Sequence, residues 1–230
     1  MFYLDPLYLV LMIPTFILSL LSSFAVKSAF KKYSKIGNSG NITGKEMAER
    51  LLSRNGISDV QVLKADGFLS DHYDPSKRVI KLSSGVYDSN SVAAIGIAAH
   101  ETGHAIQHAK AYSPLKLRNL MVPMASIGSN FSYFVIFIGM MMSAMELVKI
   151  GIVFFAIVVA FQIITLPVEF DASSRAKRMM REYAYVSETD MKGVSKVLNA
   201  AAMTYVAAAA SSIMTLLYFL MRSGILGGDD

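Results

Sequence analysis

The chain has 230 residues, of which 53% are hydrophobic and only 17% are charged, whereas soluble domains carry about 25% charged residues. This composition argues against a soluble protein and indicates an integral membrane protein. Basic segments beside anionic lipid account for the net charge of +5, and no basic stripe with interleaved aromatic residues indicates a nucleic-acid partner. The absence of cysteine excludes disulfides and thiolate metal ligands.

Four apolar runs are long enough to cross about 30 Å of hydrocarbon, which takes roughly 20 helical residues. They comprise residues 7–26, 121–145, 150–168 and 201–221, and none has a charged residue in its interior. We expect the first run to be a membrane anchor and not a cleaved signal peptide, because no positive side chain precedes it. The sequence therefore predicts about four transmembrane helices.

The distribution of basic residues predicts the orientation of these helices. Four lysines follow the first run, at positions 27, 31, 32 and 35, and four basic residues follow the third, at positions 175, 177, 178 and 181. Residues 27–120 and 169–200 together hold 20 of the 22 Lys and Arg residues. Since basic flanks remain in the cytoplasm, we expect the N-terminus outside the cell membrane and these two segments inside.

These patterns predict a mostly α integral membrane protein with a small cytoplasmic α+β unit. The expected segments are an N-terminal transmembrane helix (1–26), the α+β unit (27–120), a transmembrane hairpin (121–168), a cytoplasmic helix (169–200), and a C-terminal transmembrane helix with its tail (201–230).

Within the α+β unit, Thr43 and Glu46 form a capping-box pattern that predicts a helix, and Asn55-Gly56 ends it. Short β-like runs at residues 60–63, 67–70 and 78–82 predict strands. Residues 83–90 are predicted as a loop that leads into a second helix over residues 91–107, which contain no proline.

This second helix carries the sequence His100-Glu101-Thr102-Gly103-His104. The two histidines are one turn apart on one helix face, so both imidazoles can bind one Zn²⁺. Glu101 projects beside them, where it can take a proton from a metal-bound water. The apolar, alanine-rich residues 92–99 before the motif are typical of a buried active-site helix.

A catalytic zinc ion usually has three protein ligands and one open position. His108 cannot be the third ligand, because it lies about 12 Å from His100 along a straight helix. Glu169 is the better candidate, since a membrane hairpin between residues 121 and 168 would bring it back to the histidines. Asp171 is then expected to accept a hydrogen bond from a ligand histidine, or to be the ligand in place of Glu169, which would leave Glu169 a solvated carboxylate at the membrane border.

Three segments together resemble a known family: Asp71-His72-Tyr73-Asp74-Pro75 with the strand that follows, the motif from His100 to His108, and Pro167-Val168-Glu169-Phe170-Asp171-Ala172-Ser173. Over nearly the whole chain they resemble the YugP-like neutral zinc metallopeptidases of bacterial membranes. A more distant resemblance is to the HtpX/Ste24-type gluzincin membrane peptidases. In those enzymes the later segment reads Glu-x-x-x-Asp, whereas here Ser173 stands at that spacing and the acid is at Asp171.

The resemblance implies a gluzincin-like cytoplasmic catalytic unit with one zinc ion per chain, and a peptide or membrane-protein substrate. Zinc held by His100, His104 and Glu169 would lower the pKa of its water to about 7. Glu101 would take the proton from this water and pass it to the leaving amine. The oxyanion needs a further donor, for which the candidates are His72, Tyr73 and Arg175. The strand at residues 78–82 would be the sheet edge that pairs with the substrate.

Two other classes of function are weighed against a peptidase. A non-catalytic membrane protein could use a structural or sensory zinc site, closed by His72 or Asp171 as a fourth ligand. A metal transporter would need polar ligands inside its spans, and the four apolar runs contain no acidic residue or histidine.

Overall fold

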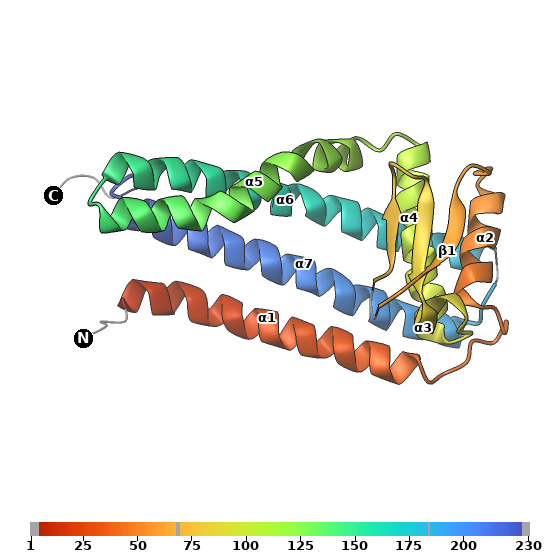
Figure 1. Cartoon of the computed structure of the whole chain (residues 1–230). Coiled ribbons are helices and arrows are strands. Elements are labelled where there is room, and N and C mark those ends of the chain that lie inside the picture. Colours follow the sequence, from red (N-terminus) through yellow and green to blue (C-terminus); the bar gives the residue numbers. More distant parts are fainter. Residues whose placement is uncertain (1–4, 68–69, 184, 227–230) are drawn as a thin grey trace. The chain divides into compact units, whose positions relative to one another are not determined.

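The computed structural model describes residues 5–67, 70–183 and 185–226, and helices make up 74% of the chain. The elements follow one another as shown in Figure 1. They are α1 (Pro6–Tyr33), α2 (Gly44–Arg54), β1 (Gln61–Ala65), β2 (His72–Asp74), β3 (Val79–Ser83), α3 (Ser84–Tyr87), α4 (Val92–Ala109), α5 (Ser113–Met141), α6 (Met145–Glu182) and α7 (Glu188–Arg222).

Helices α1, α5, α6 and α7 are long and apolar enough to cross a membrane. This confirms the prediction of four long apolar helices and is consistent with a multi-pass membrane protein. Helices α1, α6 and α7 extend beyond both ends of the apolar runs that predicted them, and α6 continues from the end of its run at residue 168 to Glu182. Helix α5 begins before its run, at Ser113, and ends at Met141, before the predicted end at residue 145. Hydropathy marks only the lipid-compatible part, whereas the backbone hydrogen bonds of a helix also continue through polar sequence.

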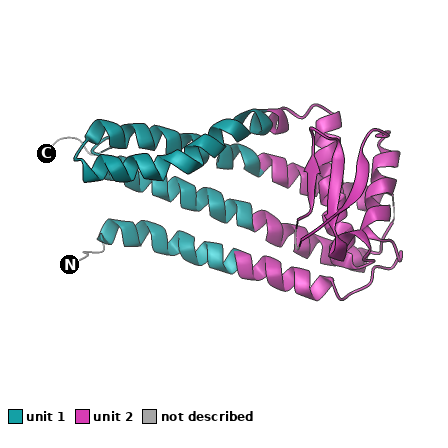
Figure 2. Ribbon diagram, in the orientation of Figure 1, with its two compact units in different colours: residues 1–22, 117–166, 204–230 teal, residues 23–116, 167–203 magenta. Residues whose placement is uncertain are grey.

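The chain forms two compact units (Figure 2), each of which gathers segments that are distant in sequence. The helical unit comprises residues 1–22, 117–166 and 204–230, and the mixed unit comprises residues 23–116 and 167–203. In the helical unit, α5 and α6 pack closely at Gly151, where an added Cβ would lie only 2.5 Å from Ile136 Cγ1. Helices α1 and α7 meet there through Ser19 and Ser211, whose hydroxyls are 3.4 Å apart.

The mixed unit contains a three-stranded sheet of order β1-β3-β2. Strand β1 is parallel to β3, and β2 is antiparallel to it, with Tyr73 opposite Ile80. Ile80 and Leu82 are fully buried in a core that they share with residues of α2 and α4. Helix α2 begins at the predicted capping box, in which Thr43 and Glu46 satisfy each other's backbone N–H groups.

Three local predictions were wrong. Gly67 and Ser70 are not in a strand, and residues 68–69 lie outside the described residues; the strand is instead β2, whose polar His-Tyr-Asp sequence lacks an apolar alternation. The predicted loop at residues 83–90 contains the short helix α3. Strand β3 lies at the centre of the sheet and is not an edge, because β1 and β2 pair with its two sides.

Candidate metal centre

Helix α4 supplies the two histidines of the site. Ser91 caps its first turn, since the Ser91 hydroxyl accepts a hydrogen bond from the Ala94 N–H. The rings of His100 and His104 then lie on one face, with their centroids 4.8 Å apart. Local sequence is therefore enough to present both imidazoles to one point.

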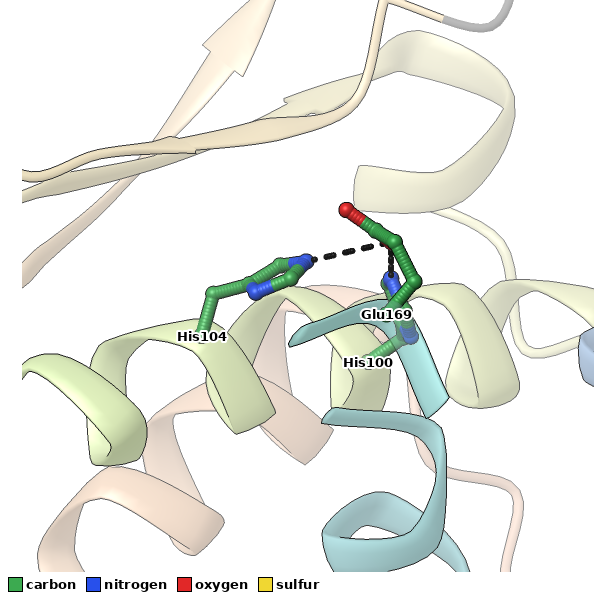
Figure 3. Close-up of side chains that lie close together, drawn as sticks. All are labelled: His100, His104 and Glu169. Carbon is green, nitrogen blue, oxygen red and sulfur yellow. Dashed lines mark hydrogen bonds and ion pairs between the residues drawn. The ribbon is translucent and has the colours of Figure 1, made fainter. Parts of the chain in front are cut away.

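Glu169 reaches these histidines from α6, as Figure 3 shows. Its Oε2 atom lies 3.2 Å from His100 Nε2 and 3.5 Å from His104 Nε2. One ligand atom from each of the three residues lies within 4.8 Å of the others, and Glu169 is only 3% exposed. We call His100, His104 and Glu169 the metal-ligand group.

Gly103 allows α6 to approach α4 this closely. A Cβ at position 103 would lie 2.6 Å from the carbonyl oxygen of Ala172 and 3.1 Å from its Cα. Real Cβ atoms do not come so near a backbone oxygen, so any side chain here would push α6 away. Since Ala172 is less than one turn from Glu169, this contact sets the distance of the carboxylate from the histidines.

Gln107 determines which nitrogen of His104 faces Glu169. Its amide Nε2 donates to the Val168 carbonyl and to Asp171 Oδ2, each at 2.8 Å. The amide oxygen is therefore the atom 3.0 Å from His104 Nδ1, so Nδ1 carries the proton and donates. In the neutral ring Nε2 is then unprotonated and free to bind a metal.

His100 is held in a similar way, because its Nδ1 lies 3.0 Å from the Ser173 hydroxyl. Ser173 occupies the position at which the distant gluzincin relatives have an aspartate. Both histidines thus have a polar partner on Nδ1 and turn Nε2 toward Glu169. Neither Gln107 nor Ser173 was identified from the sequence; the available signals were the one-turn spacing of Gln107 from His104 and the position of Ser173 after Glu169.

The donor set and its spacing fit one Zn²⁺. Two imidazole nitrogens and one carboxylate oxygen are ligands that zinc accepts, and two ligands about 2.1 Å from a tetrahedral ion lie about 3.4 Å apart. The measured separations of 3.2 and 3.5 Å agree with this spacing. Within the described ranges the group contains three residues, which is the number of protein ligands that a catalytic zinc ion usually has.

Glu101 lies on α4 between the two histidines in sequence and is 8% exposed. Its carboxylate has no hydrogen-bond or ion-pair partner among the described residues, unlike that of Glu169. Burial acts to lower the pKa of His104, but the hydrogen bond to Glu169 and the charge of Glu101 outweigh it and raise this pKa. Glu101 is therefore close enough to the site to influence it and is not committed to another partner.

The remaining predicted site residues have partners of their own. Asp171 was expected to accept a hydrogen bond from a ligand histidine, but it does not. It accepts hydrogen bonds from Gln107 and, at 2.5 Å, from Arg175. It therefore supports His104 indirectly, through Gln107. Arg175 also lies over the ring of Tyr112.

The two predicted residues of β2 have other partners. His72 is exposed and pairs with the Ser70 carbonyl. The Tyr73 hydroxyl pairs with His108 Nδ1 at 2.8 Å.

Comparison with known proteins shows the family of the chain. Residues 8–224 match the family described as "Putative neutral zinc metallopeptidase". The chain is 45% identical to "Putative membrane protease YugP" of Bacillus subtilis (strain 168) over 224 aligned residues. The aligned region covers 97% of this chain and 99% of that protein. No solved structure matches the chain. Since its sequence matches the family model almost from end to end, the chain belongs to the family described as "Putative neutral zinc metallopeptidase".

Proposed function

We propose that this protein is a membrane-embedded zinc endopeptidase that hydrolyses peptide bonds at the cytoplasmic face of the membrane. The observation that carries the proposal is the metal-ligand group itself, in which two histidines of α4 and Glu169 of α6 converge beside the unpaired carboxylate of Glu101. This arrangement supports a gluzincin-like site with one zinc ion per chain.

When bound, the zinc ion would supply a Lewis acid that acidifies water and polarises the scissile carbonyl. The chain's own residues would perform the proton transfers. Glu101 takes a proton from the attacking water and passes it to the leaving amine. Gln107 and Ser173 hold the two imidazoles in the tautomer and orientation that the reaction needs.

The edge of the sheet offers a place for the substrate backbone. Strand β2 is at the edge, and no strand among the described residues pairs with its outer side. An extended peptide can add to such an edge through backbone hydrogen bonds. Because β2 also packs against α4, a peptide bound there runs along the helix that carries Glu101.

A structural or sensory zinc site is the alternative. Such a site fills all four positions with protein ligands, and His72 or Asp171 would have to close it. In the part of the chain that the structure describes, His72 pairs with Ser70, while Asp171 pairs with Gln107 and Arg175. These contacts favour an open, catalytic site.

The direct test is Glu101→Gln, assayed by cleavage of casein with the purified, zinc-loaded protein. Removal of a general base lowers turnover by about 10²- to 10⁴-fold, while the zinc content should remain that of the wild type. Glu49→Gln, an exposed carboxylate of α2, is the matched control and should retain full activity. A Glu101→Gln protein that cuts casein at the wild-type rate would reject the mechanism.

The proposed orientation rests on the basic flanks and can be tested separately. Because the chain has no cysteine, single cysteines can be introduced without background. Lys45→Cys in the mixed unit should react with a membrane-impermeant maleimide only in inverted vesicles. Ser143→Cys, between α5 and α6, should react in whole cells, and the opposite pattern would place the site outside.

A further inference from the structure

A recess of about 290 Å³ opens beside the last two turns of α4 in the mixed unit. Its polar lining consists of His108 and Tyr73, which are hydrogen-bonded to each other, and Arg78 and Asp59, which form an ion pair. His108 is the third histidine of α4, and the proposed hydrolysis does not use it. The recess is near the lower end of ligand-pocket volumes, so it is large enough to hold an amino-acid side chain.

The recess continues the helix stripe that carries Glu101. Ala105 and His108, which both line it, follow Glu101 by four and seven residues and therefore lie on the same side of α4. With a rise of about 1.5 Å per residue, they are roughly 6 and 10 Å farther along the helix. An extended peptide covers such a distance in about two or three residues.

A peptide paired with the edge of β2 would place one of its side chains at the same recess. Tyr73 is the middle residue of β2, and its side chain turns toward α4, as its contact with His108 shows. In a strand added at the edge of β2, the residue opposite Tyr73 would have its side chain on the same face of the sheet. That side chain would enter the recess beside Tyr73 and His108.

The side chains that line the recess have hydrogen-bond donors that their bonds to one another do not use. A phenol has one O–H donor and a neutral imidazole has one N–H donor. The hydrogen bond between Tyr73 and His108 uses one of these two donors, and the other remains available to a ligand. Burial raises the pKa of Tyr73, which keeps its phenol protonated. The Arg78 guanidinium has five N–H groups, of which Asp59 engages only part, and its side chain is 56% exposed.

We infer that this recess is a substrate subsite that accepts an aspartate or glutamate side chain, with Arg78 and the Tyr73–His108 pair as its donors. The inference rests on the proposed peptidase function and specifies its substrate class: peptides with an acidic residue two or three positions from the scissile bond. Asp59 opposes a second carboxylate, but the Arg78 ion pair neutralises it.

The test uses binding, so that it does not depend on cleavage. Fluorescein-labelled octapeptides, in which Glu, Lys or Leu is placed at one position at a time in an alanine background, are titrated against the full-length, zinc-loaded Glu101→Gln protein. At one position we expect the Glu peptide to bind about tenfold more tightly than the Lys peptide, as one charge-assisted hydrogen bond allows. In Arg78→Glu this preference should reverse.

Lys77→Glu is the matched control, since it makes the same charge change on the neighbouring residue, which does not line the recess. It should keep the preference for Glu. Asp59→Asn is the second variant and should bind the Glu peptide more tightly than its parent, because it frees Arg78. If Arg78→Glu fails to fold, as judged by its zinc content, Asp59→Asn decides alone.

The absence of binding, a preference for Leu, or equal behaviour of Arg78→Glu and Lys77→Glu would overturn the inference. In the absence of Arg78→Glu data, unchanged binding by Asp59→Asn would do the same. These results are separate from the test of the peptidase. If the wild-type protein cuts casein but binding shows no charge preference, the peptidase function stands and the subsite is rejected. If binding shows the preference but the wild-type protein does not cut casein, the peptidase function is rejected and the acidic binding recess stands.

Discussion

The helical unit and the mixed unit satisfy their polar side chains in different ways. In the helical unit, several hydroxyl groups bond back to carbonyls of their own helix, as Thr165 does to the Phe161 carbonyl and Thr215 to the Ser211 carbonyl, although Ser19 and Ser211 also link α1 and α7. In the mixed unit, buried polar side chains connect separate elements: Gln107 of α4 donates to the Val168 carbonyl of α6, and Ser83 donates to Asp71.

This difference indicates where a site can be built. In lipid the backbone polar groups of a helix must find their partners inside that helix, so the structure of the helical unit depends mainly on contacts within each helix. In the mixed unit the partners come from distant segments, and removal of one residue leaves another without its hydrogen bond. Changes at the polar contacts around the metal-ligand group in the mixed unit should therefore affect metal binding, while changes in the helical unit should affect only stability.

The largest effect is expected from Glu169→Ala. With one of three ligands lost, the zinc content of the purified protein should fall from about one ion per chain to near zero. Glu146→Ala is the control, because this glutamate lies on the same helix in the helical unit and, among the residues that the structure describes, pairs only with Lys149 at the surface. An unchanged zinc stoichiometry in Glu169→Ala would show that Glu169 is not a ligand.

A second prediction compares two tightly packed glycines. Gly103→Val should cost about 1–3 kcal/mol and weaken zinc binding, because its side chain would displace Ala172 and with it Glu169. Gly151→Val should cost a similar amount through its contact with Ile136, but zinc binding should persist. Thermal unfolding in detergent and competition with a chelator measure the two effects, and wild-type zinc affinity in Gly103→Val would contradict the proposed role of this contact.

A smaller effect is expected from Gln107→Leu, which removes the acceptor that fixes His104 Nδ1. Loss of such a partner typically weakens metal affinity by about 10- to 100-fold, and the same chelator competition measures it. Gln162→Leu, on α6 in the helical unit, should bind zinc like the wild type. Equal affinities in the two variants would mean that His104 is oriented by packing alone.

The smallest effect concerns stability within the mixed unit. Burial acts to raise the pKa of Asp190, but hydrogen bonds from Ser39 and Ser187 outweigh it and hold this pKa below its ordinary value. A lowered folded-state pKa stabilises the protein above the unfolded pKa of about 4, and this contribution is lost as the pH falls through the folded value. Asp190→Asn should therefore unfold at a lower temperature than the wild type at pH 7, and the difference should shrink below about pH 4. A difference independent of pH would exclude this origin.

Patterns that depend on neighbours in sequence predicted much of the molecule. The apolar runs predicted four long helices, and the capping box at Thr43 predicted the start of α2. The spacing of His100 and His104 placed both rings on one face of α4. The argument from a membrane hairpin brought Glu169 to this face, where the structure places it, and its role as a ligand remains a prediction.

Features that depend on contacts between distant segments were missed or wrong. Strand β2 has no apolar alternation, and only its pairing with β3 makes it a strand. The expected hydrogen bond from a histidine to Asp171 is replaced by one to Gln107, which lies between them. Ser173 was noted only as a departure from a pattern, although it contacts His100.

The sequence by itself determined the four long apolar helices and the paired histidines, because hydropathy and helix periodicity act over a few turns of one segment. Only the tertiary structure decided which nitrogens face Glu169, which strand forms the open edge, and how closely α6 approaches α4 at Gly103. These properties depend on distances between segments as much as 73 residues apart in the chain, and no local pattern records such distances.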